Sequence, residues 1–191
     1  MVRDSLVQIE TDDRRLLDRI DASLGESVRR SGEWVVCRAG CTQCCLGPFA
    51  ITALDALRLR RGLEGLASKD EARAERLGAR VADYTSLLAS LGGTDPLAHE
   101  ELENLPCPVL DPATGLCDLY DARPITCRTF GPVTRTADGN LAACELCYEG
   151  ATDVEMAQCV VEVDPDGLEE KLLHALGEDG MTIVARALAD F

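Results

Sequence analysis

Aromatic residues are scarce in this chain of 191 residues, at 4% of the total, and lysine is scarcer still, with two residues against seventeen arginines. Apolar residues nevertheless make up 46% of the chain, enough for a core built mainly from Leu, Ala and Val. The net charge is −15, and the sequence has no run of basic residues. Such an acidic surface repels phosphate backbones and anionic lipids, so we expect neither a nucleic-acid partner nor a membrane surface.

The chain also lacks the segments that direct proteins into or across membranes. No stretch approaches the roughly 18 apolar residues of a membrane span. The N-terminal residues 1–10 show neither the apolar region nor the cleavage site of a signal peptide. We therefore expect a cytoplasmic location, where thiols are kept reduced and a disulfide framework is disfavoured.

Ten cysteines stand out against this background. Four of them lie within nine residues, at Cys37, Cys41, Cys44 and Cys45, and the other six are Cys107, Cys117, Cys127, Cys144, Cys147 and Cys159. Thiolates bind zinc and iron tightly, and a Cys-x2-Cys loop lets two sulfurs reach one ion. Cys41/Cys44 and Cys144/Cys147 have this spacing, so the pattern predicts a metal site that long-range folding closes. Cys159, between Gln158 and Val160, is instead expected to be a small buried apolar residue.

The adjacent pair Cys44-Cys45 needs a separate explanation. Neighbouring side chains of an extended chain point to opposite sides, so both can bind one ion only if the backbone bends. A bridging role between two metals and a strained vicinal disulfide are the alternatives.

The pattern of apolar, capping and turn residues predicts a mainly α fold with a small irregular, β-hairpin segment that carries cysteines. We expect a metal-stapled single domain over residues 1–191, with an N-terminal helix over 5–31, a metal-binding core over 37–150 and C-terminal helices over 164–191. Thr11 to Asp13 offer a cap for the first helix. Thr52 with Asp55 resembles a capping box that starts a second helix, expected to run to about residue 61.

Helices are also predicted over about 69–90, with Leu77, Val81, Tyr84 and Leu88 on one face, and over about 96–104. Asp111 to Gly115 form a turn that would place Cys107 and Cys117 across from each other on a hairpin. Pro124 can open one turn of helix that carries Cys127. The final helices are expected at about 166–176 and 182–190.

Four stretches together resemble the bacterial CxxCxxCC cysteine-cluster family. They are Cys37-x3-Cys41-x2-Cys44-Cys45, Pro106-Cys107-Pro108-Val109-Leu110, Gly115-Leu-Cys-Asp-Leu-Tyr120 and Arg123-Pro-Ile-Thr-Cys-Arg-Thr-Phe130. Members of this family are described as zinc- or iron-chelating, some are labelled Fe–S oxidoreductases, and a similar domain is attached to flagellin lysine methylases. The resemblance implies that the metal ligands are Cys37, Cys41, Cys44, Cys45, Cys107, Cys117 and Cys127, with Cys144 or Cys147 completing the set.

Arg123 and Arg128 flank Cys127 and could donate hydrogen bonds to sulfur, which would tune a bound metal. The alternative is that they form ion pairs with neighbouring acids such as Asp118 and Asp121. The sequence leaves both possibilities open.

The first hypothesis is therefore a metal-binding protein that carries zinc or an iron–sulfur cluster and supports electron transfer, metal handling or protein modification, with a protein or a small substrate as its partner. The second is a zinc-stapled scaffold that binds another protein. The third is a metal-free dithiol redox enzyme that acts through Cys44 and Cys45. No catalytic residue can be assigned from the sequence.

Overall fold

The computed structural model describes residues 2–92, 95–136, 138–178 and 180–189. The chain forms two compact units, each built from separate parts of the sequence. We call residues 1–38 together with 125–178 the long-helix unit, and residues 39–124 together with 179–191 the thiol unit. The mainly α fold with small strand pairs is confirmed, whereas the single domain over residues 1–191 stays a prediction.

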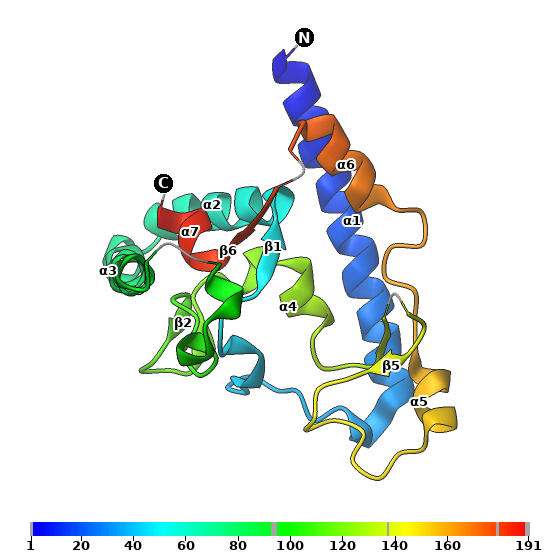
Figure 1. The fold of residues 1–191 in the computed structure, drawn as a ribbon. Coiled ribbons are helices and arrows are strands. Elements are labelled where there is room, and N and C mark those ends of the chain that lie inside the picture. The colour runs from blue at the N-terminus through cyan, green and yellow to red at the C-terminus, as the bar shows by residue number, and fades with distance from the viewer. Residues whose placement is uncertain (1, 93–94, 137, 179, 190–191) are drawn as a thin grey trace. The chain divides into compact units, whose positions relative to one another are not determined.

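The long-helix unit is organised along α1 (Val2–Ser31), against which three shorter helices pack (Figure 1). These are α4 (Ile125–Thr129), α5 (Asp153–Cys159) and α6 (Leu168–Leu176). Ile9, Leu16, Ile20 and Leu24 are buried on one face of α1, as their spacing by seven and four residues requires. β4 (Thr134–Arg135) and β5 (Leu141–Ala142) add an antiparallel hairpin.

The helix predicted over residues 5–31 is confirmed, but the cap predicted at Thr11 is wrong. Thr11 lies inside α1, and its hydroxyl donates to the carbonyl of Val7 rather than accepting from a free amide. A threonine within a helix can bond back to the preceding turn, so the same residue type serves both positions. Although α1 has 30 residues, no helix in the described part of the chain is long and apolar enough to cross a membrane.

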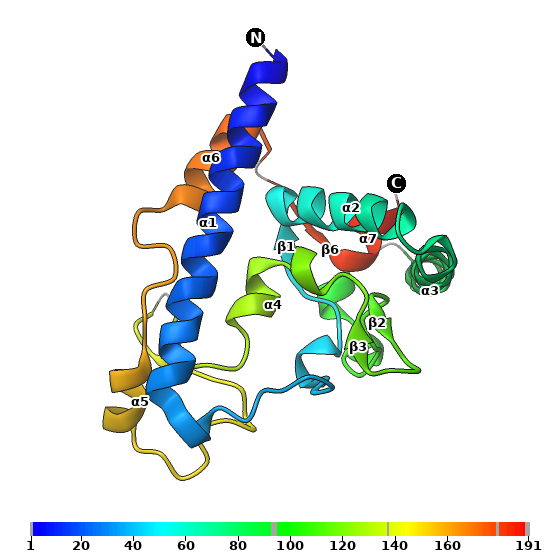
Figure 2. The same ribbon diagram turned by 180° about the vertical axis from the view of Figure 1, so that it is seen from behind.

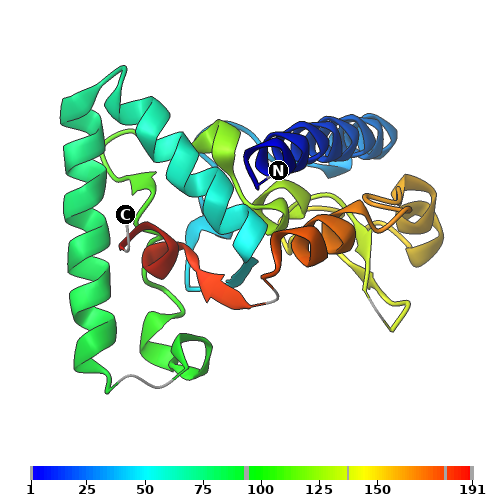
Figure 3. The ribbon, with the colours of Figure 1, turned by 90° about the horizontal axis from the view of Figure 1, so that it is seen from above.

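In the thiol unit, α2 (Ala53–Ala67) packs against α3 (Glu71–Ser90) and α7 (Val184–Ala189), as Figures 2 and 3 show from two further directions. Two antiparallel strand pairs complete it. The first joins β1 (Ala50–Thr52) to β6 (Met181–Ile183), and the second joins β2 (Leu110–Asp111) to β3 (Leu116–Cys117). The core of the unit contains Ile51, Leu59, Leu77, Val81, Val109, Leu119 and Leu188.

Local signals position the two long helices of this unit as predicted. Thr52 and Asp55 form a reciprocal capping box at the start of α2, which continues to Ala67 rather than ending near residue 61. The side chain of Asp70 caps α3 by accepting from the amide of Arg73. The predicted apolar face of α3 is buried as expected, including Leu77 and Tyr84.

Three other parts of the chain differ from the prediction. Residues 96–104 form two 3₁₀ helices, η3 (Pro96–Ala98) and η4 (Glu100–Leu102), instead of one helix. α5, capped by Thr152, was not predicted. The helix expected at 182–190 begins two residues later because residues 181–183 pair with β1 from far earlier in the sequence; its expected end, Asp190, lies outside the described residues.

One glycine of α2 allows a close approach that the site depends on. A Cβ added at Gly62 would lie 2.5 Å from the Cβ of Ala122, in the 3₁₀ helix η5 (Tyr120–Ala122), whereas one added at Gly65 would meet nothing within 4 Å. Only two residues separate η5 from β3, so this contact holds the end of the cysteine-bearing hairpin against α2.

We expect Gly62→Ala to destabilise the protein and Gly65→Ala to stabilise it. Overpacking costs about 1–3 kcal/mol, which exceeds the gain of up to about 1 kcal/mol from replacing a helical glycine by alanine. Urea denaturation of both variants measures the two free energies of unfolding. Equal stabilisation by both substitutions would contradict the close contact at Gly62.

Candidate metal centre

Cys44 and Cys45 lie on a bent backbone, as one shared metal site would require of neighbouring residues. They belong to the 3₁₀ helix η2 (Gln43–Cys45), closed by a hydrogen bond of 2.8 Å from the amide of Cys45 to the carbonyl of Thr42. The bend allows the two thiols to share a hydrogen bond, in which Cys45 is the donor.

Backbone pairing joins this loop to Cys107. The amide of Cys107 donates to the carbonyl of Cys45 at 2.7 Å, and the amide of Gly47 donates to Leu105 at 2.9 Å. Gly47 has φ +72°, and a Cβ there would lie 3.0 Å from the carbonyl oxygen of Glu103, so the pairing needs glycine at this position. Segments sixty residues apart in the sequence are thereby held side by side.

The predicted turn between Cys107 and Cys117 is confirmed, but their register differs from the prediction. The amide of Gly115 closes this turn by donating to the carbonyl of Asp111 at 2.8 Å. Cys117 stands opposite Leu110 rather than opposite Cys107. Cys107 precedes β2 and lies in a tight turn, in which the amide of Leu110 donates to its carbonyl at 3.0 Å.

Backbone hydrogen bonds favour the charged form of both cysteines. Those from Val109 and Leu110 act to lower the pKa of Cys107, and that from Leu119 acts to lower the pKa of Cys117. Hydrogen bonds of this kind stabilise the thiolate, which is the form that binds metals. The two turns are therefore shaped to support charged sulfur.

Four thiols of this unit are mutually close. Each of Cys44, Cys45, Cys107 and Cys117 interacts electrostatically with the other three. Burial, together with the charges of Cys117 and Cys44, raises the pKa of Cys107 to about 11 despite the lowering by its backbone hydrogen bonds. Burial likewise raises the pKa of Cys117. These are the shifts expected where several negative charges would share one partly buried space.

The vicinal pair divides its acidity unequally. The hydrogen bond from Cys45 lowers the pKa of Cys44 to about 6, against an opposing effect of burial. The same bond, with burial and the charges of the other three thiols, raises the pKa of Cys45 far above its ordinary value. Cys44 is thus the thiol of this group that ionises first.

Arg123 brings positive charge to the same place. Its charge lowers the pKa of both Cys44 and Cys117. Its guanidinium lies 3.5 Å from the centre of the Tyr120 ring, and its Nε donates to the Tyr120 carbonyl at 2.8 Å. For Arg123, a hydrogen bond to sulfur and an ion pair with a neighbouring acid both stay predictions.

The other predicted ligands are distributed over both units. Cys41 lies in the thiol unit, three residues before Cys44, and is half-buried. The long-helix unit contains Cys37, Cys127, Cys144 and Cys147, together with Cys159. Cys159 is 2% exposed and donates from sulfur to the carbonyl of Glu155, which confirms its expected role as a buried apolar residue.

Within the long-helix unit, Cys37 and Cys144 both lie close to Gly131. The Sγ of Cys37 would be 2.6 Å from a Cβ at Gly131, and the carbonyl of Gly131 accepts from the amide of Cys144 at 3.2 Å. Cys144 and Cys147 are buried at 6% exposure in an apolar cluster with Val133 and Tyr148. The Cys-x2-Cys turn is present, because the amide of Cys147 donates to Cys144 at 2.8 Å.

The ion pair predicted between Arg128 and Asp118 is not the one that the fold forms. Arg128 pairs with Asp21 of α1 at 2.8 Å, not with Asp118. Asp118 is bound by Arg73 and Arg80 instead. These two arginines are seven residues apart on one face of α3, a spacing that the sequence displays, but nothing in it identifies an aspartate 38 to 45 residues away as their partner.

The thiol group fits zinc or iron by the chemistry of its donors. Among the described residues, no three or more His, Cys, Asp or Glu side chains are already arranged as ligands of a metal ion. Binding a metal would release the thiol protons and let the sulfurs turn toward the ion.

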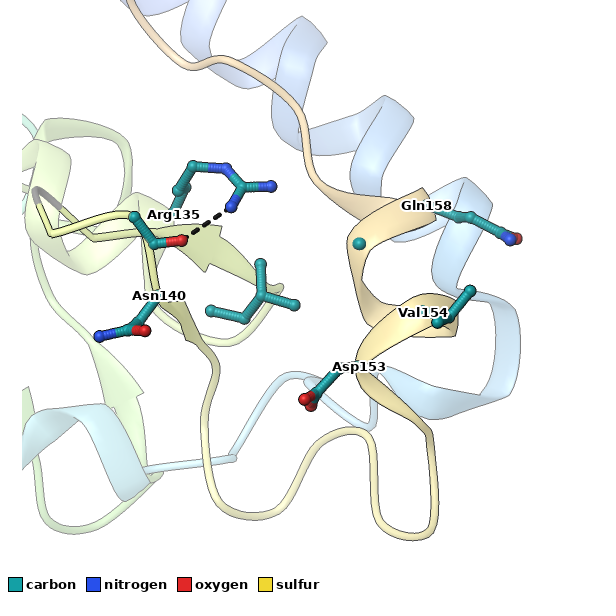
Figure 4. Close-up of a pocket in the computed structure, with 8 residues that line it drawn as sticks. Arg135, Asn140, Asp153, Val154 and Gln158 are labelled. Carbon is teal, nitrogen blue, oxygen red and sulfur yellow. Dashed lines mark hydrogen bonds between the residues drawn. The ribbon is translucent and has the colours of Figure 1, made fainter.

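One cavity of the described residues has no cysteine in its lining, and another is too small to hold a substrate. A hollow of about 830 Å³ in the long-helix unit lies between the β4–β5 hairpin and α5. Figure 4 shows Arg135 and Asn140 on one side and Asp153 on the other, and no cysteine lines it. The space behind Cys107, bounded by Tyr84 and Ile183, holds only about 10 Å³, less than a water molecule needs.

In metal-free, reduced protein, we expect the alkylation rate of Cys44 to rise with a midpoint near pH 6, because its thiolate is the nucleophile. Cys45→Ala removes the hydrogen-bond donor and should move the midpoint toward the ordinary value of about 8.5. Cys45→Ser keeps a donor and should leave the midpoint low. Mass-spectrometric peptide mapping after brief iodoacetamide pulses gives each midpoint, and an unchanged midpoint in the alanine variant would contradict the proposed hydrogen bond.

Comparison with known proteins gives one family match. Residues 36–148 match the CxxCxxCC family, described as a putative zinc- or iron-chelating domain. No curated protein and no solved structure matches the chain. The match spans more than half of the chain and includes all nine cysteines that the sequence pointed to as ligands. The protein is a member of the CxxCxxCC family of zinc- or iron-chelating domains.

Proposed function

We propose that the chain binds a zinc ion or an iron–sulfur cluster through the thiolates of Cys44, Cys45, Cys107 and Cys117. The observation that supports this assignment is that each of the four thiols interacts electrostatically with the other three. They come from two segments that backbone pairing joins, so their proximity is a property of the fold rather than of one flexible loop.

Charge explains why a metal belongs at this place. Four thiolates in one partly buried space repel one another, in a chain that already has a net charge of −15. A bound cation offsets that repulsion, and the amides at residues 109, 110 and 119 would support the sulfurs that it draws together. Arg123 would add a further positive charge beside them.

A centre with four protein thiolates is closed, because it leaves no coordination position for a substrate. Closed zinc sites serve as structural staples, and cysteine-ligated iron–sulfur clusters carry electrons. We therefore propose a structural role for zinc or electron transfer with a partner protein for iron, rather than Lewis-acid catalysis. A zinc staple would also suit the segment from Cys107 to Cys117, which has only a two-residue strand pair of its own.

The remaining predicted ligands stay candidates. Cys41 could join the four thiolates from within the thiol unit. In the long-helix unit, the candidates are Cys37, Cys127 and either Cys144 or Cys147. A separate group of ligands in that unit would account for a cysteine count beyond that of one four-thiolate site.

A second candidate function is metal-free dithiol chemistry at Cys44 and Cys45. The hydrogen bond between the two thiols and the lowered pKa of Cys44 favour it, because a thiolate beside a second thiol is the arrangement that thiol–disulfide exchange uses. Cys107 is less suited to such exchange, because burial keeps its pKa high and the thiolate is the nucleophile.

Purification without oxygen, followed by elemental analysis and visible absorption, separates these functions. Iron with acid-labile sulfide supports a cluster, and stoichiometric zinc in a colourless sample supports a structural staple. Protein that binds neither metal after reconstitution, yet cycles between two thiols and a disulfide at residues 44 and 45, contradicts the metal proposal and supports the dithiol function.

We expect Cys117→Ser to lose the bound metal and much of the stability of the thiol unit, since a hydroxyl is a poor replacement for a thiolate ligand. Cys159→Ser is the matched control, because Cys159 is buried among apolar groups of the long-helix unit and its variant should keep the metal. Metal content per chain and thermal unfolding with and without chelator measure both effects. Equal metal retention by the two variants would show that the assigned ligands are wrong.

A further inference from the structure

One guanidinium connects the two turns that carry Cys107 and Cys117. Arg80 of α3 donates from Nε to the carbonyl of Pro108 at 2.9 Å, and from Nη2 to the carboxylate of Asp118. Pro108 directly follows Cys107, and Asp118 directly follows Cys117. Arg80 thus holds the residue that follows each of these two cysteines at the same point of α3.

The carboxylate that Arg80 binds is one that the fold must neutralise. The side chain of Asp118 is 1% exposed, and Arg73 binds its other oxygen. A buried carboxylate without a partner is strongly unfavourable, and the charge of Asp118 would oppose ionisation of the adjacent Cys117. The two arginines therefore allow Asp118 to remain buried as an anchor beside a thiolate.

The support from which Arg80 reaches the hairpin is rigid. Leu77, Val81 and Tyr84, on either side of Arg80 in α3, are all buried. The amide of Asp118 donates to the carbonyl of Val109 at 2.9 Å, so the bonded carboxylate belongs to the residue that also closes the hairpin. The planar fork of a guanidinium can make both bonds at once, which a lysine ammonium on its flexible stem cannot do in the same geometry.

We propose that Arg80 is a positioning residue for the metal centre, which fixes the separation of the sulfurs of Cys107 and Cys117 by bridging Pro108 and Asp118. The proposal rests on the proposed function, because it assigns Arg80 a role toward the metal that Cys107 and Cys117 would share. It does not make Arg80 a ligand, since a guanidinium carries no free electron pair for a cation.

Cobalt(II) is the probe, because its visible absorption reports both the number of thiolate ligands and the geometry around the ion. Full-length protein, reduced and metal-free, is titrated with Co²⁺ for the wild type, Arg80→Met, Arg80→Lys and Arg60→Met. Arg60 is the matched control, because its guanidinium also donates to a backbone carbonyl of the thiol unit, that of Ala187 at 2.8 Å, in a segment without cysteine. Denaturation of each metal-free variant is measured separately.

We expect Arg80→Met to raise the dissociation constant for Co²⁺ by about 10–100-fold, as loss of groups that orient metal ligands commonly does, and to change the thiolate-to-cobalt absorption bands. Arg80→Lys should keep most of the stability of the metal-free fold but not restore the bands. Arg60→Met should keep the wild-type affinity and spectrum. If Arg80→Met unfolds without metal, the lysine variant provides the test on its own.

Two outcomes overturn the inference while leaving the proposed function intact. The first is wild-type affinity and spectrum in the Arg80 variants, and the second is an equal loss of affinity in Arg80→Met and Arg60→Met, which would reflect stability alone. A wild-type protein that gives no thiolate-to-cobalt absorption would overturn the proposed function itself.

Discussion

The thiol group depends on the backbone pairing that joins the loop after Cys45 to the segment before Cys107. This pairing consists of short amide-to-carbonyl bonds between residues 45–47 and 105–107, and glycine at position 47 makes the close approach possible. Without it, the two groups of cysteines would be separated by two helices and two 3₁₀ turns of chain. Backbone geometry, rather than the metal alone, therefore brings the sulfurs together.

Electrostatics then determines what such a group can do. The thiols of Cys107 and Cys117 are hard to ionise because they are partly buried and close to other thiols. Backbone amides favour the charged forms of both, and Arg123 favours that of Cys117. These opposing influences are characteristic of a place where charge is present only when a cation accompanies it. The hydrogen bond between Cys45 and Cys44 reflects the same conflict, because it lowers the pKa of Cys44 and raises that of Cys45.

Local sequence signals predicted much of the fold. The capping box at Thr52 and Asp55, the buried face of α3 and the turn at Asp111 to Gly115 depend on residues a few positions apart, so spacing was sufficient to identify them. The pairing of β1 with β6 could not be predicted in this way, because its strands are about 130 residues apart and neither has a distinctive alternation. For the same reason the end of the chain was predicted as helix alone.

The site was predicted only in part. Spacing and family resemblance gave nine candidate ligands as one set, but they could not show that Cys44, Cys45, Cys107 and Cys117 share one unit while Cys37, Cys127, Cys144 and Cys147 belong to the other. The ion pairs of Asp118 were also missed. Neighbouring arginines in the sequence, Arg123 and Arg128, seemed the natural partners, whereas the fold supplies Arg73 and Arg80 from α3.

Differential alkylation of metal-loaded and chelator-treated protein, with each cysteine quantified by mass spectrometry, tests the central claim most directly. The account predicts that Cys44, Cys45, Cys107 and Cys117 are protected together in the loaded protein and become reactive together when the metal is removed. Cys159, buried in either state, provides the internal reference. Reaction of these four cysteines at the same rates with and without bound metal would contradict it.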